Sequence, residues 1–258
     1  MKFQFYLDKI NSEYFRIKVT LKYILLLIIN RIYSPKKFDV KGIPIIINNR
    51  NRLSYMEMLI CSLEKRGYYN IYIIDNNSTY PPLLDFYDNR CKYKVFRLKK
   101  NVGYTALWDT GLIKKFRNNY FVYTDSDVVF TDDCPENILE VLLDFLIKYP
   151  GIHKVGPALE ISNLPDCNRE RVLKAESGFW KCKISESPQA YKACIDTTFA
   201  LHRPWTFKHM GIFYPQIRVG YPYVMKHMPW YEDSNSLSEE SLYYKQNVNT
   251  QSTWYTNQ

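Results

Sequence analysis

The chain has 258 residues, of which 46% are hydrophobic and 16% are aromatic. This composition supports a packed core and excludes disorder over most of the length, and the length suits one catalytic domain with an appendage. The formal charge is +9, but residues 1–41 hold nine Lys and Arg against three Asp and Glu, so residues 42–258 carry only +3. That nearly neutral part has no standard nucleic-acid motif, so we expect no nucleic-acid partner.

Residues 1–41 form a basic, aromatic leading segment, expected to be helical, that contains the apolar run 23–29. The run is shorter than the roughly 20 residues that span a bilayer, and it lacks the small-residue cleavage site of a signal peptide. Two interpretations stay open: a helix that lies on an anionic membrane surface, or a helix that packs on the domain with a solvated basic face.

From residue 43 onward, apolar runs alternate with amphipathic segments. We predict strands at 43–47, 71–74, 93–96 and 120–123, and helices at 54–67, from 81, at 104–116 and at 135–149. Ser54 and Glu57 fit a capping box at the first of these helices. The alternation predicts an α/β fold with a mostly parallel sheet. After residue 151 the pattern is less regular, with a strand expected at 195–201 and a helix from 237.

Polar clusters follow three predicted strands: residues 48–52, 75–78 and 125–127. In parallel sheets, ligands gather beyond the carboxyl ends of the strands, so we expect the clusters to converge on one edge. Asp125 and Asp127 come directly after an apolar strand, where two carboxylates are costly unless a cation meets them. Mg²⁺ or Mn²⁺ with a diphosphate is the natural partner, and a solvated turn in which Asp125 caps the next helix is the alternative.

The order of these motifs resembles the family 2 glycosyltransferases of the GT-A fold. The resemblance rests on Ile-Pro-Ile-Ile-Ile-Asn-Asn-Arg-Asn-Arg, Ile-Ile-Asp-Asn-Asn-Ser, Asn-Val-Gly and Tyr-Thr-Asp-Ser-Asp, which lie in this order in residues 43–130. It implies a Rossmann-like mixed, mostly parallel sheet flanked by helices. It also implies a domain at 42–258, with a nucleotide-binding half at 42–135 and an acceptor-binding half at 136–258.

The resemblance implies roles for individual residues. Asp75 would contact the nucleobase, although Asp-Asn-Asn-Ser is also good Asx-turn chemistry. Asp125 would contact ribose or metal, Asp127 would coordinate Mn²⁺ or Mg²⁺, and His227 would be an additional metal ligand. The full set of expected nucleotide-sugar contacts is Asn48, Arg50, Arg52, Asp75, Asn77, Asn101, Gly103, Asp125 and Ser126.

The catalytic base and the acceptor site are less defined. Glu239 and Glu240 resemble the acidic pair that opens a helix in this family, Asp196 is the rival base, and a favourable charge at a helix N-terminus is the plain interpretation of the pair. Trp180, Trp230 and Tyr231 are expected to contact the acceptor, although most aromatic residues belong to cores.

The implied reaction is inverting transfer of a sugar from a nucleoside-diphosphate sugar to a hydroxyl of a glycan, lipid-linked glycan or glycoprotein. A sugar-phosphate nucleotidyltransferase and a non-catalytic relative that binds nucleotides or glycans are the alternatives, and the first is disfavoured because residues 48–53 lack glycine. The six cysteines are scattered without a Cys-x-x-Cys pair, so we expect reduced thiols in a cytoplasmic protein, peripheral at the inner face of a membrane if residues 1–41 bind it.

Overall fold

A computed structural model describes residues 2–32, 39–208 and 215–247. The strands are β1 (Ile45–Asn49), β2 (Ile71–Asp75), β3 (Lys94–Arg97), β4 (Phe121–Asp125), β5 (Val128–Phe130), β6 (Lys154–Leu159), β7 (Lys183–Glu186), β8 (Gln189–Lys192), β9 (Ala200–His202) and β10 (Ile217–His227). The helices are α1 (Lys2–Ile32), α2 (Ser54–Lys65), α3 (Pro81–Asn89), α4 (Ala106–Asp109), α5 (Ile138–Lys148), α6 (Asp166–Glu176) and α8 (Glu239–Gln246).

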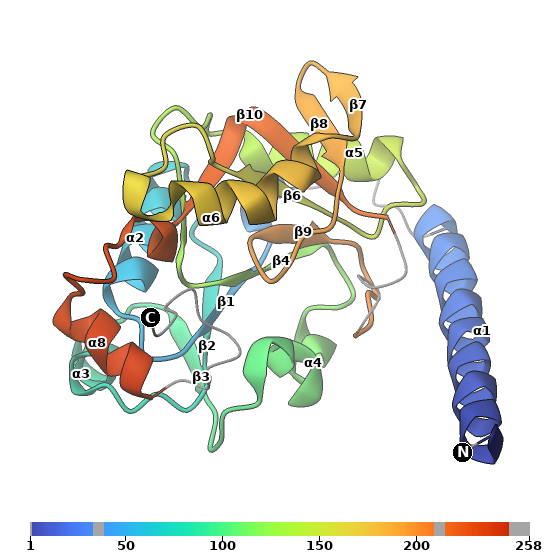
Figure 1. The fold of residues 1–258 in the computed structure, drawn as a ribbon, viewed down its shortest axis with the longest axis horizontal. Coiled ribbons are helices and arrows are strands. Elements are labelled where there is room, and N and C mark those ends of the chain that lie inside the picture. Colours follow the sequence, from blue (N-terminus) through green and yellow to red (C-terminus); the bar gives the residue numbers. More distant parts are fainter. Residues whose placement is uncertain (1, 33–38, 209–214, 248–258) are drawn as a thin grey trace.

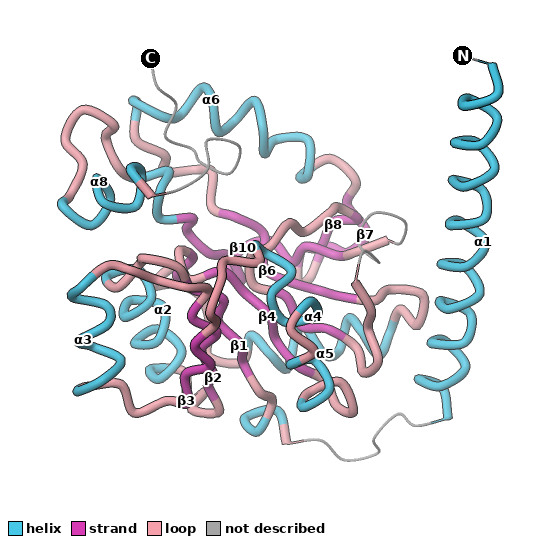
Figure 2. Tube along the Cα trace, turned by 90° about the horizontal axis from the view of Figure 1, so that it is seen from below, coloured by secondary structure: helices cyan, strands magenta, loops and turns pink. Residues whose placement is uncertain are grey.

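All ten strands form one mixed sheet (Figures 1 and 2). Its order is β3-β2-β1-β4-β9-β6-β10-β8-β7, and β5 pairs with β10. The pairs β3–β2, β2–β1, β1–β4 and β6–β10 are parallel, whereas β9, β5 and β8 run against their neighbours. Seven of the ten strands therefore point the same way, which confirms the α/β fold class with a mostly parallel sheet.

The apolar strands of the first half are covered on both faces, as a parallel sheet requires. Ile45 and Ile47 face the cluster to which α2 and α5 contribute, whereas Ile46 faces a second cluster with Ala106 and Leu107 of α4. All three isoleucines are fully buried, and each such side chain contributes about 1.5–3 kcal/mol of transfer free energy. The parallel pairing of β1 with β2 and with β4 brings the carboxyl ends of these strands to one edge of the sheet.

Two predicted elements differ from the structure. The helix expected at 104–116 is broken into a 3₁₀ turn at Gly103–Thr105, the short α4, and a second turn at Leu112–Lys115. Gly111 lies between α4 and the second turn with φ +75°, a left-handed conformation that ends a helix. The strand expected at 195–201 is reduced to β9, because only Ala200 to His202 pair with β4 and β6.

The predicted capping box at Ser54 is wrong. The N-cap residue is Leu53, which makes no side-chain cap hydrogen bond. The carboxylate of Glu240, from α8, instead accepts the N–H groups of Leu53 and Ser54, each at 2.9 Å. A carboxylate stabilises a helix N-terminus whether it comes from a nearby or a distant residue. Glu240 therefore provides the capping that the local sequence pattern attributed to Ser54.

The long helix α1 stands at the edge of the molecule in both views (Figures 1 and 2). Its expected helical character is confirmed over Lys2–Ile32. Among the described helices, α1 included, none is long and apolar enough to cross a membrane.

Candidate functional site

The polar clusters converge on one edge of the sheet, as predicted. The register pairs Asn49 of β1 with Asp75 of β2, and it pairs Asn48 with Asp125 of β4. The loops after these three strands therefore leave the sheet side by side. The carboxyl-terminal edge of β2-β1-β4 is the place where a ligand contacts all three clusters.

Asp75 lies buried in the loop after β2 and begins an Asx turn. Its carboxylate accepts the N–H of Ser78 at 3.2 Å, and Asn77 adopts a left-handed conformation with φ +61°. Burial raises the pKa of Asp75, and the positive charges of Arg97 and Arg50 oppose this shift. The turn and a base contact are compatible, because the turn uses only part of the hydrogen-bonding capacity of the carboxylate. Base contact stays a prediction.

We expect Asp75→Asn to raise stability while it weakens nucleotide binding. Because burial raises the pKa of Asp75, the protein loses stability as the pH rises from the usual range of an aspartate to the raised pKa. Asparagine escapes this loss, so the gain in melting temperature should be present at neutral pH and disappear at acid pH. Loss of a charge-assisted hydrogen bond should weaken nucleotide affinity by about tenfold or more. Thermal melts across pH and calorimetric titration measure both effects, and a fall in melting temperature at neutral pH would contradict the assignment.

The loop after β3 contributes the Asn-Val-Gly motif. Asn101 is exposed, and its side chain accepts the N–H of Gly103 at 2.9 Å. Gly103 has φ +76° and its carbonyl accepts the side-chain amide of Asn76 at 2.9 Å. This glycine is a turn residue that ties the third loop to the second, and a nucleotide contact stays a prediction.

Asp125 is the more enclosed carboxylate of the Asp-Ser-Asp motif. Its N–H donates to the carbonyl of Thr197 at 3.0 Å, and the hydroxyl of Thr197 donates to its carboxylate. Burial, followed by the charge of Asp127, raises the pKa of Asp125 well above its usual range. Ser126, between the two, is buried. A cation in front of the pair would relieve the cost of placing these two carboxylates together.

Asp127 faces His227. Antiparallel pairing of β5 with β10 aligns Val128 with His227, and this brings the imidazole Nε2 within 3.6 Å of the Asp127 carboxylate. Burial lowers the pKa of His227, so its imidazole is neutral, which is the form that binds a metal. The edge of Trp230 meets the His227 ring, with centroids 4.9 Å apart.

These residues fit a divalent cation shared with a phosphate. Mg²⁺ and Mn²⁺ sites of this kind use one or two carboxylates and leave the other positions to phosphate oxygens and water. Asp127 and His227 offer two ligands side by side. Over the described ranges there is no group of three His, Cys, Asp or Glu side chains that could hold a metal without further ligands.

The acidic candidates for the catalytic base lie in three different environments. Glu240 is buried and its carboxylate is committed to Leu53 and Ser54, including the Ser54 hydroxyl at 3.2 Å. Glu239 is exposed on the first turn of α8. Asp196 is exposed and lines a cavity beside Asp125. The hydrogen bonds of Glu240 therefore hold the N-terminus of α2, and a catalytic role for each of the three acids stays a prediction.

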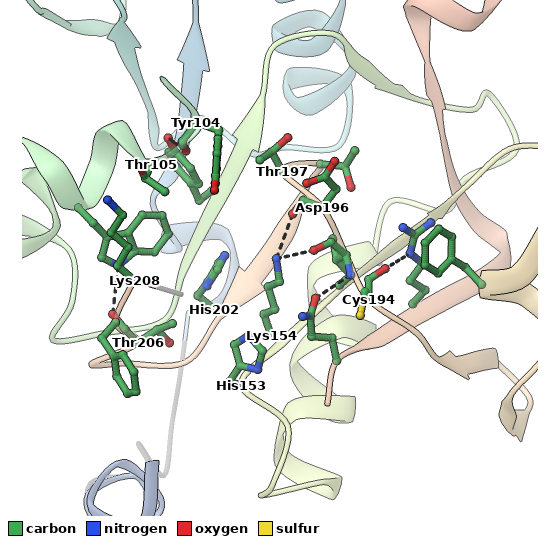
Figure 3. Close-up of a pocket in the computed structure, with 18 of the residues that line it drawn as sticks. Tyr104, Thr105, His153, Lys154, Cys194, Asp196, Thr197, His202, Thr206 and Lys208 are labelled. Carbon is green, nitrogen blue, oxygen red and sulfur yellow. Dashed lines mark hydrogen bonds between the residues drawn. The ribbon is translucent and has the colours of Figure 1, made fainter. Parts of the chain in front are cut away.

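That cavity has a volume of about 440 Å³, and Thr197 and Asp196 are among its lining residues (Figure 3). The Thr197 hydroxyl connects the cavity to the Asp-Ser-Asp motif, because it donates to the carboxylate of Asp125. Tyr104, Trp108 and Phe179 supply aromatic walls. Buried Nδ1 atoms of two histidines and a buried hydroxyl on the lining have no hydrogen-bond partner in the described residues; they belong to His153, His202 and Thr198. The aromatic walls suit the flat face of a sugar ring.

Lys154 positions the loop of residues 194–198, which lines the cavity. Its ammonium donates to the carbonyls of Ile195 at 2.9 Å and Asp196 at 3.0 Å (Figure 3). Burial lowers the pKa of Lys154 to about 8, against the opposing charge of Asp196. These bonds connect the first residue of β6 to the loop that contains Asp196 and Thr197, and they fix the backbone of that loop.

The helix α8 connects the loop after β1 to the loop after β2. Arg52 donates to the hydroxyl of Ser241 at 2.9 Å and lies 3.9 Å above the ring of Tyr244. Tyr243 donates to the carbonyl of Thr79 at 2.9 Å. Burial, followed by the charge of Asp127, raises the pKa of Tyr244 to about 12. The sequence offered no signal for Tyr244 or for the engagement of Arg52, because both depend on contacts between distant segments.

The three aromatic residues expected at the acceptor do not form one surface. Trp180 stacks on Tyr221, with centroids 5.1 Å apart, and Tyr231 donates to Asn163 at 2.8 Å. Trp230 is 2% exposed and supports His227, which gives it no free face for an acceptor. The described lining of the cavity includes none of the three. Acceptor contact through Trp180 and Tyr231 stays a prediction.

Residues 45–153 match the family model for glycosyl transferase family 2. Through this match, the segment is similar to the family 2 glycosyltransferases. It contains Asp75, Asp125 and Asp127, whereas Asp196 and His227 lie beyond its end. No curated protein matches the chain.

Three solved structures are similar to parts of the chain. The crystal structure of S. aureus TarS 1–349 in complex with UDP-GlcNAc is 16% identical, with a TM-score of 0.38, and covers 63% of this chain and 45% of its own. A mycobacterial protein is 14% identical, with a TM-score of 0.43, and covers 75% and 72%. A cytidylyltransferase from Leptospira borgpetersenii is 13% identical, with a TM-score of 0.34, and covers 48% and 56%. The chain spans less than half the length of the TarS structures, and similarities this low assign no activity.

Proposed function

We propose that the protein is a glycosyltransferase that moves a sugar from a nucleoside-diphosphate sugar to a hydroxyl of a glycan or glycoconjugate. The observation that carries the proposal is the approach of Asp127 and His227, 3.6 Å apart, at a sheet edge that also holds Asp75. The match of residues 45–153 to family 2 supports it. In this proposal, residues 42–135 bind the donor and residues 136–258 bind the acceptor.

Each group has a distinct role in the proposed reaction. Asp75 accepts hydrogen bonds from the nucleobase, and Asp125 orients the ribose and the Thr197 loop. Asp127 and His227 would hold Mn²⁺ or Mg²⁺, which neutralises charge on the departing diphosphate when bound. Asp196 takes the proton from the acceptor hydroxyl, whose oxygen bonds to the anomeric carbon as the bond to the diphosphate breaks. Attack from the opposite face inverts the configuration.

The 440 Å³ cavity is the proposed place of the reacting sugars. It opens beside Asp196 and Thr197, and Thr197 contacts the carboxylate of Asp125. Residues 1–41 are proposed to keep the enzyme at the inner face of a membrane, where a lipid-linked or surface glycan is a fitting acceptor.

The choice of base predicts opposite results for two acidic residues. Asp196→Asn should lower kcat by about 10²–10⁴-fold with little change in KM for the donor, because only proton transfer is lost. Glu240→Gln should keep kcat near native and lower the melting temperature, because the N-terminus of α2 loses its charged acceptor, an interaction of about 1 kcal/mol. Steady-state kinetics measure kcat and KM of both variants, and thermal melts measure their stability. A large fall in kcat for Glu240→Gln, with near-native kcat for Asp196→Asn, would assign the base to Glu240.

Product identity tests the function itself. Incubation with a panel of nucleotide sugars and Mn²⁺ should release a nucleoside diphosphate, with transfer to an acceptor or slow hydrolysis to free sugar. Release of pyrophosphate from a sugar phosphate and a nucleoside triphosphate would instead identify a nucleotidyltransferase. Donor binding without any turnover would identify a non-catalytic relative.

A further inference from the structure

The helix α1 has two apolar faces, and the domain covers only one of them. Val19 and Leu26 are buried, at 6% and 3% exposure. On the same side, the Tyr23 hydroxyl donates to the carbonyl of Gly151, and the Lys22 ammonium lies 5.5 Å above the ring of Phe207. These contacts hold the helix against the domain through its second half.

The opposite face is an exposed apolar stripe. Tyr14, Ile17, Leu21, Ile24 and Ile28 recur at intervals of three and four residues, with Leu25 beside them, and each is between 47% and 66% exposed. At about 100° per residue, this spacing places them on one side of the helix, roughly half a turn from Val19 and Leu26. Single exposed apolar residues are ordinary, but a continuous stripe over four turns of one helix indicates a binding surface.

Charge decides which occupant fits the stripe. The segment Lys2–Ile32 carries six Lys and Arg against two Asp and Glu. Lys18, between Tyr14 and Leu21 in the sequence, and Arg31, three residues after Ile28, are exposed at the two borders of the stripe. Two copies of α1 would bring like charges together, whereas an anionic lipid surface attracts each basic residue near it. Long basic side chains can also keep their charged ends at the headgroups while the stripe enters the lipid.

We propose that the exposed stripe of α1 binds an anionic phospholipid surface. The helix lies flat between the membrane and the domain, because the lipid-facing stripe and the domain-facing residues are on opposite sides. This geometry differs from a flexible tether: Tyr23, Lys22 and the buried face fix α1 on the domain, so the catalytic domain is held in one orientation on the membrane. The inference stands on α1 alone and does not depend on the proposed chemistry.

The test compares two matched leucines in the full chain. Leu21 in the stripe is 62% exposed, and Leu242 in α8 is 48% exposed. Native protein should sediment with vesicles of phosphatidylcholine and phosphatidylserine, and far less with phosphatidylcholine alone. Leu21→Ser should weaken binding to the anionic vesicles by about tenfold or more, because the variant lacks the leucine carbon atoms that enter the lipid. Leu242→Ser should bind the vesicles as tightly as native protein does.

Charge variants give a second, independent readout. Lys18→Gln and Arg31→Gln should each weaken binding about fivefold, and added salt should weaken binding of the native protein. Donor turnover in solution should be unchanged in all four variants, so failure of this inference and failure of the proposed function are distinguishable. Equal binding of Leu21→Ser and Leu242→Ser, or no preference for anionic vesicles, would overturn the proposal. So would a lipid-free dimer in sedimentation analysis that Leu21→Ser converts to monomer.

Discussion

Replacing Asp127 with Asn is expected to lower sugar transfer by about 10³-fold while the fold stays intact. The Asp127 carboxylate lies 3.6 Å from the imidazole of His227, and in the proposed reaction a cation held there would supply several kcal/mol of charge stabilisation. The fold should not suffer, because the charge of Asp127 raises the pKa of the buried Asp125, and its removal relieves that repulsion. Initial rates of nucleoside diphosphate release and thermal melts measure the two effects.

Asp133→Asn is the matched control, since Asp133 is an exposed aspartate six residues further along the chain. It should have native activity and a native melting temperature. If Asp127→Asn and the control variant both had near-native turnover, the proposed role of a metal ion at Asp127 would be wrong. A large fall in melting temperature would instead make Asp127 a structural residue.

Breaking the ion pair between Arg218 and Glu176 is expected to have the largest effect on stability. The two side chains meet at 2.6 Å with 3% and 9% exposure, and Arg218 also donates to the carbonyl of Cys194 at 2.6 Å. Its guanidinium lies 4.1 Å above the ring of Phe179. Glu176→Ala leaves a buried charge without its partner, so we expect a loss of about 3–5 kcal/mol in the free energy of unfolding, measured by chemical denaturation.

A double variant separates the buried charge from the packing. Glu176→Leu combined with Arg218→Met removes both charges and keeps most of the volume, so it should recover most of the loss. Because both residues line the 440 Å³ cavity, the double variant also tests whether their charges contribute to sugar binding. A loss below about 1 kcal/mol for Glu176→Ala would show that the arginine finds other partners, and the pair would then contribute little.

The first half of the fold was predictable because its signals are local. The apolar runs that became β1, β2 and β4 are buried on both faces, and a strand of that kind needs no knowledge of its neighbours to be recognised. Asp75 and Asp125 were selected as candidate site residues because they follow these strands. The parallel register then brought them to one edge, as sheets with helical crossovers do.

The second half was less predictable because its determinants are long-range. The pairing of β10 with β5 sets the distance between His227 and Asp127, residues 100 positions apart in the sequence. The buried Glu240 caps a helix that begins 186 positions earlier. Its sequence context resembled a catalytic pair, and only the fold reveals that its hydrogen bonds are used within the structure. The role of Lys154 beneath the cavity loop likewise has no local pattern.

The most direct test of the central claim is calorimetric titration of the protein with a nucleoside diphosphate in the presence and absence of Mn²⁺. We predict that native protein binds the diphosphate at least about tenfold more tightly with Mn²⁺, and that Asp127→Asn binds equally weakly with and without it. Equal affinity of the native protein with and without the cation would contradict the role given to Asp127 and His227.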